Sequence, residues 1–530
     1  MKKLWLWCLL CSTSVFAQGP EQYTLSFEPV SIPEMVGVQS FSYARSGDEI
    51  LILGGRLDGL HQRMPNASFD AAGHNDQMIV INVATKQVWK TKVTGSGLDL
   101  DLSEQLKATN HCFYQLKDSL MLIGGYGIRT SADDHATFTT ALYFSVSEVI
   151  AAVKKNQLTS ALFQRFENDK FAVCGGQLNH INNTWYLVGG HRFDGRYNPR
   201  NGPSFVQAYA NEVRMFTMDH GKPNFQNATR NVELLHKRDY NLVKVPTPAG
   251  SYELLALSGV FQQDFDLPFQ TTTRISADGS VRLQANFRQF YNHYECPELV
   301  VYDPTSKTTH LFMMGGIAQY YDTLGIPLQD DNVPFISTLS RLSILPDGKM
   351  EEWLLDGAMP TLLGAGSAFI PNKGASWDGT IYRWDTTDPE SLDLGYLVGG
   401  IVPNARNVFW INEGMESKAV PTVYRVRIVK AKTKGRLNTY ASNPLNVELL
   451  KHGKKDRYMV FFDLQEDAPV TVTFTDPSGK VFHQKTKKFK KGTHYWKTFL
   501  PKEKGVYRVK VYTEQHGWAR EWEQFIFIDE

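Results

Sequence analysis

The chain has 530 residues, of which 42% are hydrophobic and 21% are charged, and both fractions are ordinary for a globular protein. Its 56 Lys and Arg nearly balance its 55 Asp and Glu, so the net charge of +1 excludes a nucleic-acid binder that relies on overall positive charge. A chain of this length would hold about three or four domains, unless a repeat joins much of it into one large unit.

The N-terminus has the pattern of an export signal. Lys2 and Lys3 form a positive start, a largely apolar segment covers residues 4–16, and Ala17 supplies a small residue at the expected cleavage point. The apolar segment is too short to span a bilayer, which takes about 20 residues, and no later stretch is long and apolar enough. We therefore predict a signal peptide over residues 1–17 and no transmembrane segment. The exported protein is expected in the periplasm, on the outer cell surface or outside the cell.

A short sequence motif, which consists of an apolar run followed by two small residues, occurs six times along the chain. An apolar run bounded by a glycine turn is typical of a strand buried on both faces. The copies follow one another at intervals of 57 to 84 residues and occupy positions 51–55, 121–125, 186–190, 255–259, 312–316 and 396–400. Repetition of one strand at such intervals indicates a repeat architecture.

The same order of elements surrounds each copy. A short strand precedes the apolar run and a loop follows it. A strand that opens with Asn comes next, and a fourth strand often carries an aromatic residue. Examples are 40–43 and 112–114 for the first strand, 75–80, 211–216 and 407–410 for the third, and 87–89 and 350–353 for the fourth. Four antiparallel strands per unit, repeated radially, form a propeller blade.

This pattern resembles the kelch repeat, in which an apolar strand ending in Gly-Gly is followed by a strand opening with Asn and then by a Trp-bearing or apolar strand. The resemblance extends over residues 23–430, departs slightly where Ser258 replaces the first glycine of the fourth copy, and implies a β-propeller. We therefore predict six kelch-like blades over residues 18–430. Because an open ring would expose a sheet edge, either 23–27 or 422–429 is expected to supply the outer strand of the last blade.

After residue 430 the chain changes to short alternating strands separated by turns, as at 458–462, 470–474 and 506–511. About a hundred residues of this kind predict an immunoglobulin-like β-sandwich over residues 431–530, so the whole chain is expected to be all-β. This part holds 19 Lys and Arg against 12 Asp and Glu, a net charge of +7, which leaves −6 for the rest of the chain.

The segments 442–444, 472–481 and 504–509 resemble the C-terminal sorting domain of the type IX secretion system of Bacteroidota. That resemblance implies the outer-membrane secretion machinery as a partner. The family usually ends in a basic tail, whereas this chain ends in Asp529 and Glu530, so a plain accessory sandwich is the alternative.

Three cysteines remain after the predicted processing: Cys112, Cys174 and Cys296. An odd number argues against a disulfide framework. Each lies 12 to 19 residues before its glycine pair, so we expect small buried residues near the propeller axis. No Cys-x-x-Cys, His-x-His or His-Glu-x-x-His spacing accompanies them, and we predict neither a metal nor another cofactor.

Long polar loops follow the glycine strands, and in a propeller they would surround one mouth of the central channel. Arginine offers a planar fork for carboxylates or phosphates, and tyrosine offers a flat face with a polar tip. The candidate binding residues are Arg56, His61, Arg129, His135, His191, Arg192, Asp194, Arg238, Asp239, Tyr240, Asp264, Tyr320 and Tyr321.

These residue types favour an exported binding module for a glycan or a protein ligand. A resemblance to kelch propellers of the sialic-acid mutarotase type implies the alternative of a carbohydrate-active isomerase, with Arg56, Arg129, Arg192, Arg238 and Glu295 at its mouth. Copper radical oxidases are disfavoured because they have seven blades and a Tyr-His pair that this chain lacks. A structural surface component is a third hypothesis. An enzyme requires a carboxylate or histidine beside arginines in a closed pocket, whereas a binding module shows a shallow mouth with exposed aromatic residues.

The sixth unit has an insertion over residues 371–394 that carries Trp377 and Trp384. Exposed, these side chains would stack on a sugar or a partner protein; otherwise they pack the insertion onto its own blade. Its position between the first two strands predicts that it lies on the face opposite the long loops.

Overall fold

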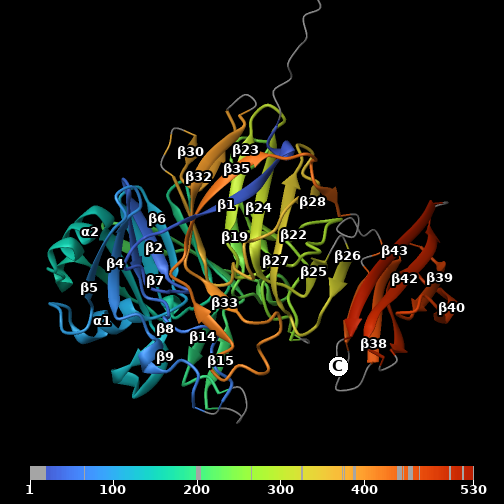
Figure 1. Cartoon of the computed structure of the whole chain (residues 1–530), viewed down its shortest axis with the longest axis horizontal. Coiled ribbons are helices and arrows are strands. Elements are labelled where there is room, and N and C mark those ends of the chain that lie inside the picture. Colours follow the sequence, from blue (N-terminus) through green and yellow to red (C-terminus); the bar gives the residue numbers. More distant parts are fainter. Residues whose placement is uncertain are drawn as a thin grey trace, which may run out of the picture.

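The computed structural model describes residues 19–528, so the predicted signal peptide lies outside the described residues. The gaps within that range are residues 65, 199–203, 264–265, 324–325, 373, 375, 386–388, 439–444, 446, 452–456, 465, 501–502 and 516–517. Six antiparallel sheets in chain order form the blades of a propeller, and a smaller β-domain stands beside it (Figure 1).

The first three blades each run from an inner to an outer strand in sequence order. Blade 1 consists of β2 (Ser42–Ser46), β3 (Glu49–Leu53), β4 (Gln77–Asn82) and β5 (Gln87–Lys92). Blade 2 consists of β6 (Cys112–Leu116), β7 (Ser119–Ile123), β10 (Thr140–Ser145) and β11 (Gln164–Glu167). Blade 3 consists of β12 (Gln177–Ile181), β13 (Thr184–Val188), β16 (Glu212–Asp219) and β17 (Lys222–Phe225), and β18 (Thr229–Arg230) also pairs with β16. The helices α1 (Leu100–Lys107), α2 (Val146–Lys155) and α3 (Val232–Leu235) connect strands around these blades.

The last three blades repeat this plan, except that the outer strand of blade 6 comes from the N-terminal part of the chain. Blade 4 consists of β19 (Asn241–Pro246), β20 (Tyr252–Leu257), β21 (Thr273–Ile275) and β22 (Val281–Leu283); blade 5 of β23 (Glu298–Asp303), β24 (Thr308–Ile317), β27 (Phe335–Ile344) and β28 (Met350–Leu354); blade 6 of β29 (Ala368–Pro371), β32 (Ser391–Val398), β35 (Val423–Lys430) and β1 (Tyr23–Val30).

Blade 6 closes the ring. Strand β1 pairs antiparallel with β35 over its full length, from Tyr23 opposite Lys430 to Val30 opposite Val423. Both segments considered for the outer strand therefore belong to this blade, β35 as its third strand and β1 as its fourth. The closed, six-bladed architecture expected from the six repeats is confirmed.

The third strand predicted at residues 407–410 is wrong. These residues lie in the loop between β33 (Ile401–Pro403) and β34 (Ser417–Ala419). The Asn407 side chain donates to Asp330 at 2.7 Å, and the aromatic side chains that follow it line the mouth of the propeller instead of entering the sheet. Within this apolar run, Val408 and Phe409 pack with residues of other blades, whereas Trp410 is largely exposed.

The first small residue of each copy of the repeated motif lies where neighbouring blades meet. Gly124 has φ +64°, and a Cβ added there would collide with the carbonyl oxygen of Val173 in the next blade. In the fourth copy Ser258 occupies this position with φ +37° and donates from its hydroxyl to the carbonyls of Phe269 (2.9 Å) and Asn292 (2.8 Å). Glycine is favoured because it accepts both the left-handed backbone and the close approach.

Gly124→Ala is expected to lower the free energy of unfolding by about 2–5 kcal/mol, since it adds backbone strain to a steric clash. Gly47→Ala is the matched control, because Gly47 has φ +60° but no heavy atom lies within 4 Å of the added Cβ. The control should cost only about 1–2 kcal/mol. Urea unfolding of both variants measures the difference, and equal losses would contradict the close-approach argument.

The insertion of blade 6 forms β30 (Trp377–Asp378) and β31 (Ile381–Arg383), and β31 pairs parallel with β23 of blade 5. Trp384 is 4% exposed and packs on Tyr23 with ring centroids 4.9 Å apart, while Trp377 packs against Phe369 and Tyr382. The insertion lies at the end of the propeller opposite the long loops, as predicted (Figure 1). The tryptophans pack the insertion onto the propeller.

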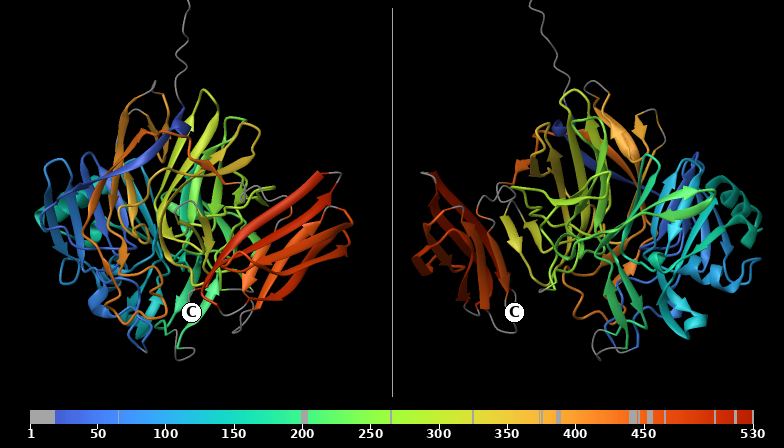
Figure 2. Two further views of the ribbon diagram at one scale, coloured as in Figure 1. Left: turned by 45° about the vertical axis from the view of Figure 1, so that its right-hand side comes forward. Right: turned by 180° about the vertical axis from the view of Figure 1, so that it is seen from behind.

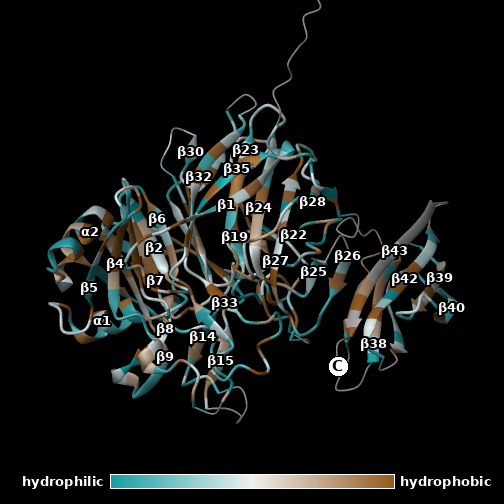
Figure 3. Cartoon of the chain, viewed as in Figure 1, coloured by the Kyte–Doolittle hydropathy of each residue, from teal (hydrophilic) through white to brown (hydrophobic). Residues whose placement is uncertain are grey.

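The C-terminal domain is a sandwich of two sheets around its own core. One sheet holds β37 (Glu448–Lys451), β38 (Arg457–Leu464) and β41 (Gly492–Phe499), and the other holds β39 (Ala468–Thr475), β40 (Val481–Phe489), β42 (Gly505–Gln515) and β43 (Trp518–Ile528). Buried side chains of both sheets, such as Val460 and Val509, make one cluster. Figure 3 shows the apolar residues concentrated on the strands. Among the described helices, none has the length and apolarity to cross a membrane.

A hairpin of the propeller extends the larger sheet of the sandwich. Strands β25 (Tyr320–Thr323) and β26 (Ile326–Gln329) leave blade 5, and β26 pairs parallel with β43 (Figures 1 and 2). The linker strand β36 (Arg436–Leu437) pairs with β28, and Arg436 forms an ion pair with Asp322 at 2.5 Å. The sandwich is therefore joined to the propeller by backbone pairing as well as by side chains.

Candidate functional site at the mouth of the propeller

The residue after each glycine pair begins the wall of the mouth. In five blades it forms a backbone bridge with a residue just before the inner strand, and in blade 6 the Ile401 N–H donates to the Ala365 carbonyl at 2.8 Å. The five bridges join Gln39 to Arg56, Thr109 to Tyr126, Cys174 to His191, Arg238 to Val260 and Tyr294 to Ile317. The wall is consequently polar or aromatic in blades 1 to 3 and aliphatic in blades 4 to 6. The loop hairpins β8 (Tyr126–Arg129) with β9 (Asp134–Thr137), and β14 (His191–Asp194) with β15 (Val206–Tyr209), continue it at this end (Figure 1).

In each blade, the residue just before the inner strand that forms this backbone contact is followed by a member of a narrow ring around the axis. We call this ring the neck ring. All six members have positive φ, between +48° and +65°. Each member from Ser40 to Glu295 donates its backbone N–H to the carbonyl of the preceding member around the axis, over 2.8–3.2 Å. The members are Ser40, Asn110, Gly175, Asp239, Glu295 and Gly366. Four of the six are not glycine, although this conformation disfavours side chains, so those four side chains are candidates for function.

Charged and polar side chains of the neck ring interact with each other and with Arg238. Arg238 forms an ion pair with Asp239, and Asn110 donates to the same carboxylate at 3.4 Å. The Ser40 hydroxyl donates to Glu295 Oε1 at 2.9 Å. Burial, together with the negative charge of Asp239, raises the pKa of Glu295 to about 7. Glu295 therefore changes its protonation state near neutral pH.

A cavity of about 560 Å³ opens above the neck ring, and we call it the mouth cavity. Its walls are rich in aromatic side chains, which contact one another; Phe193 and Phe205, for example, stack with ring centroids 4.5 Å apart. The aromatic lining residues are Phe69, Tyr126, Phe193, Tyr197, Phe205, Phe261, Tyr294, Phe409 and Trp410. The polar lining residues include His61, Arg63, Asn198, Gln207, Arg238, Asp239, Asp266 and Asp331.

Several of the polar lining residues carry buried atoms without a hydrogen-bond partner among the described residues. They are His61 Nδ1, Arg63 Nε, Asn198 Oδ1 and Asp331 Oδ2. Burial, with the nearby charges of Arg63 and Arg238, lowers the pKa of His61 to about 4, so its ring is neutral at physiological pH. Buried polar atoms normally find partners in a folded protein. The mouth cavity thus brings together donors and acceptors suited to a polar ligand.

A second cavity of about 290 Å³, the channel cavity, lies on the other side of the neck ring between the inner strands. Trp377 of the insertion and Lys244 help to line it. Burial raises the pKa of Glu298, another of its lining residues, to about 7, although Asn241 donates to its carboxylate at 2.5 Å. The Tyr240 hydroxyl donates to the Val188 carbonyl at 2.7 Å, so this candidate residue supports the channel and not the mouth.

The structure brings His61, His191, Arg238 and Asp239 together around the mouth cavity. Gln207 donates to His191 Nδ1 at 2.7 Å, which fixes the imidazole, and burial holds the pKa of His191 well below its usual range.

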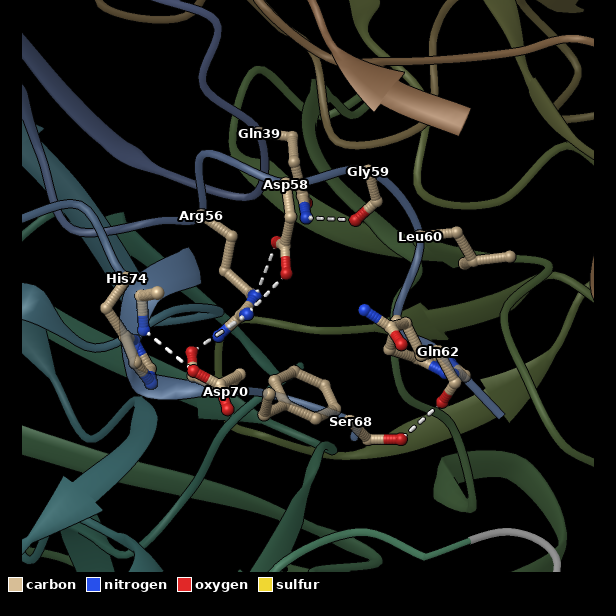
Figure 4. Close-up of polar contacts among 12 residues, drawn as sticks. Gln39, Arg56, Asp58, Gly59, Leu60, Gln62, Ser68, Asp70 and His74 are labelled. Carbon is tan, nitrogen blue, oxygen red and sulfur yellow. Dashed lines mark hydrogen bonds and ion pairs between the residues drawn. The ribbon is translucent and has the colours of Figure 1, made fainter. Parts of the chain in front are cut away.

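Arg56 lies beside these residues, 1% exposed, in an adjoining cavity of about 180 Å³. Its guanidinium donates to Asp58 at 2.7 and 2.5 Å and to the Asp70 carbonyl at 3.2 Å, while Gln39 donates to the Gly59 carbonyl nearby (Figure 4). Arg56 therefore holds the first loop in place.

Other candidate residues lie away from the mouth cavity. Alternation along β14 turns Arg192 and Asp194 outward, where they pair with each other at 2.6 Å. Arg129 lies over the ring of Phe138 at 5.8 Å, and His135 Nε2 donates to the Phe69 carbonyl at 2.8 Å.

Tyr320 and Tyr321 are 1% and 5% exposed and belong to the hairpin that joins the sandwich. Tyr320 packs on Phe290 with ring centroids 4.7 Å apart. Asp264 lies outside the described residues.

The aromatic lining residues Phe193, Phe205, Phe261, Phe409 and Trp410 were not among the candidates, which were chosen for charge and polarity. Phe205 and Phe261 are aromatic residues close to polar ones in their loops, and that contrast is the signal by which they could have been found, whereas Phe409 and Trp410 belong to the apolar run that was predicted to be a strand. Phe193 could also have been found from period-two alternation, because it shares a strand face with His191.

Comparison with models of protein families and with curated proteins gives no match. Among solved structures, YjhT is similar at 10% identity, with 75% of this chain and 100% of that chain covered and a TM-score of 0.41. PorZ, a surface component of the type IX secretion system of Porphyromonas gingivalis, shows 9% identity over 92% and 86% of the two chains with a TM-score of 0.16. A glycoside hydrolase family 43 arabinoxylan arabinofuranohydrolase from Bacillus subtilis shows 10% identity over 93% and 96%, with a TM-score of 0.29. Values this low add nothing to the propeller that the sheets themselves show.

Proposed function

We propose that the mouth cavity binds a carbohydrate and that the protein is a glycan-binding propeller. The observation that carries the proposal is the set of buried polar atoms without partners on His61, Arg63, Asn198 and Asp331, within aromatic walls. A sugar offers hydroxyl groups that donate and accept hydrogen bonds, and apolar ring faces that stack on aromatic side chains. The same cavity supplies partners for both.

The shape of the site favours a small ligand over a protein surface. Its volume of about 560 Å³ falls within the range of about 300–1,000 Å³ typical of small-molecule sites. Arg238 and Asp239 converge at its floor, where a protein partner would have to insert a loop to reach them. A stable protein interface instead needs a broad contact area of roughly 1,200 Å² or more.

Calorimetric titration with a panel of neutral and acidic monosaccharides tests the proposal. We expect at least one sugar to bind at one site and Arg238→Ala to weaken binding about 10- to 100-fold, because it leaves the Asp239 carboxylate unpaired beside the ligand. Arg192→Ala is the matched control: Arg192 also pairs with a carboxylate close in sequence, that of Asp194, but faces away from the cavity. The absence of any bound sugar, or equal losses in the two variants, would contradict the proposal.

A second candidate function is acid–base catalysis on the bound sugar, as in the interconversion of anomers by a mutarotase-type isomerase. It is favoured by Glu295, whose pKa of about 7 lies near physiological pH and which, with Asp239, lines the cavity of about 180 Å³ that adjoins the mouth cavity. Opening of a cyclic sugar needs a proton at the ring oxygen and loss of one from the anomeric hydroxyl. In this scheme Glu295 supplies the first proton and Asp239 accepts the second.

A further inference from the structure

A loop over residues 404–416 forms part of the rim of the mouth cavity and is held on two sides. The Asn412 side chain is fully buried and donates to the carbonyls of Leu60 (2.7 Å) and His61 (2.9 Å), and the Arg63 N–H donates back to the Asn412 carbonyl at 3.1 Å. On the other side, Asn407 donates to Asp330 of blade 5. The loop is thus fixed between the loops of blades 1 and 5.

The tip of this loop is closed by one carboxylate. Glu416 accepts hydrogen bonds from the backbone N–H groups of Glu413, Gly414 and Met415 at 2.8, 3.1 and 3.0 Å. Such contacts hold the tip in one conformation before any ligand arrives. Binding to a surface already in place loses less conformational entropy than binding to a loop that must become ordered.

Trp410 lies on this loop at the boundary between the mouth cavity and solvent. It lines the mouth cavity, yet 59% of the residue is exposed. The Arg63 guanidinium lies 4.4 Å from the centre of its ring, and Phe409 beside it stacks on Phe335, which anchors the neighbouring backbone. A large aromatic side chain on a rigid rim, half in the cavity and half in solvent, extends the cavity outward.

We propose that Trp410 is the platform of a second sugar subsite, so that the ligand is an oligosaccharide with its terminal residue in the mouth cavity and the next residue stacked on Trp410. This inference rests on the proposed carbohydrate function. The apolar face of the second sugar contacts the indole, and Arg63, whose Nε has no partner among the described residues, supplies a donor to its hydroxyl groups. Continuity with a cavity lined by unpartnered polar atoms favours a sugar chain over a lipid or an apolar peptide.

The test compares a monosaccharide that binds the wild-type full chain with the corresponding di-, tri- and tetrasaccharides, by calorimetric titration. The wild type is expected to bind the oligosaccharides about tenfold more tightly, which corresponds to about 1.4 kcal/mol. Trp410→Ala should abolish this preference and leave the monosaccharide affinity within about twofold, and Trp410→Phe should keep part of it. Phe499→Ala is the matched control, because Phe499 on the sandwich is 61% exposed and lies beneath the Arg457 guanidinium at 5.2 Å but is not one of the residues that line the mouth cavity.

Each outcome has a separate meaning. A preference for oligosaccharides that survives in Trp410→Ala overturns the second subsite while the carbohydrate function stands. An equal loss of monosaccharide and oligosaccharide affinity also overturns it, because Trp410 would then shape only the first site. Binding of anionic lipid vesicles, or of an apolar peptide, without any sugar binding would overturn the inference and the proposed function together.

Discussion

Glu295→Gln is expected to slow the interconversion of sugar anomers by about 10²- to 10⁴-fold, the usual contribution of a positioned acid or base. The amide keeps the size of the side chain and can still accept the hydrogen bond from Ser40. It cannot release a proton, so sugar affinity should stay within a few-fold of the wild type while the rate falls. Exchange spectroscopy by NMR on an equilibrated sugar solution measures the rate, and calorimetric titration measures the affinity.

The pH profile and a matched control separate catalysis from structure. Because Glu295 has a pKa of about 7 in the folded protein, its acid form is present below that pH and is lost as the pH rises through it. An acid role therefore predicts a rate that falls through pH 7. Both carboxyls line the channel cavity, but only Glu295 also lines the small cavity beside the mouth; Glu298→Gln removes a carboxyl whose pKa is likewise about 7, so its rate should match the wild type. Equal losses in the two variants would contradict the acid role, and sugar binding without turnover in the wild type would leave a binding module.

Leu25→Asp is expected to lower the free energy of unfolding by about 3–5 kcal/mol, the usual cost of an uncompensated buried charge. Leu25 is 5% exposed and packs in the core between blades 5 and 6, where no water can solvate a carboxylate. Since β1 closes the ring, loss of its packing also frees the edge of β35. Urea unfolding followed by tryptophan fluorescence measures the effect.

Ser26→Asp is the control on the adjacent residue of the same strand. Ser26 is half-buried on the other face of β1 and lies opposite Arg427 in the pairing with β35. An aspartate there meets an arginine across the strands, so the stability should change by less than about 1 kcal/mol. Losses of similar size in the two variants would show that any change in β1, and not the loss of core packing, opens the ring.

The repeated motif was sufficient to predict the propeller. The burial of its strand on both faces and the turn at its glycines depend on neighbouring residues that are similar in every blade. Predictions became wrong where a residue departs from that environment. The Asn-led apolar run at 407–410 has the pattern of a third strand, yet it lies in a loop, where Val408 is buried, Phe409 stacks on Phe335 of blade 5 and Trp410 is largely exposed. The sequence did not decide which of the two segments forms the outer strand of blade 6, because no local feature distinguishes two adjacent strands of one blade.

The site was predicted less completely than the fold. Sequence places His191 and Arg192 in the same loop, but the alternation of β14 sends one into the mouth cavity and the other into solvent. Tyr320 and Tyr321 follow a glycine pair as other mouth residues do, but their hairpin pairs with the sandwich, a contact between segments far apart in the chain. Glu295 belongs to a ring of residues with left-handed backbone angles, and these angles could not be predicted from the residue types.

The pairing of Tyr23 with Lys430 also sets an order of events in folding. The strand that leaves the ribosome early has its partner about 400 residues later, so β1 stays unpaired until nearly the whole propeller has been made. Contacts this distant in sequence form slowly, and an unpaired strand edge promotes aggregation in the meantime. Blades 1 to 5 can each assemble from local hairpins, but the ring closes last, through its most long-range contact. Mutations in β1 should therefore act on the rate of this final step more than on the formation of the individual blades.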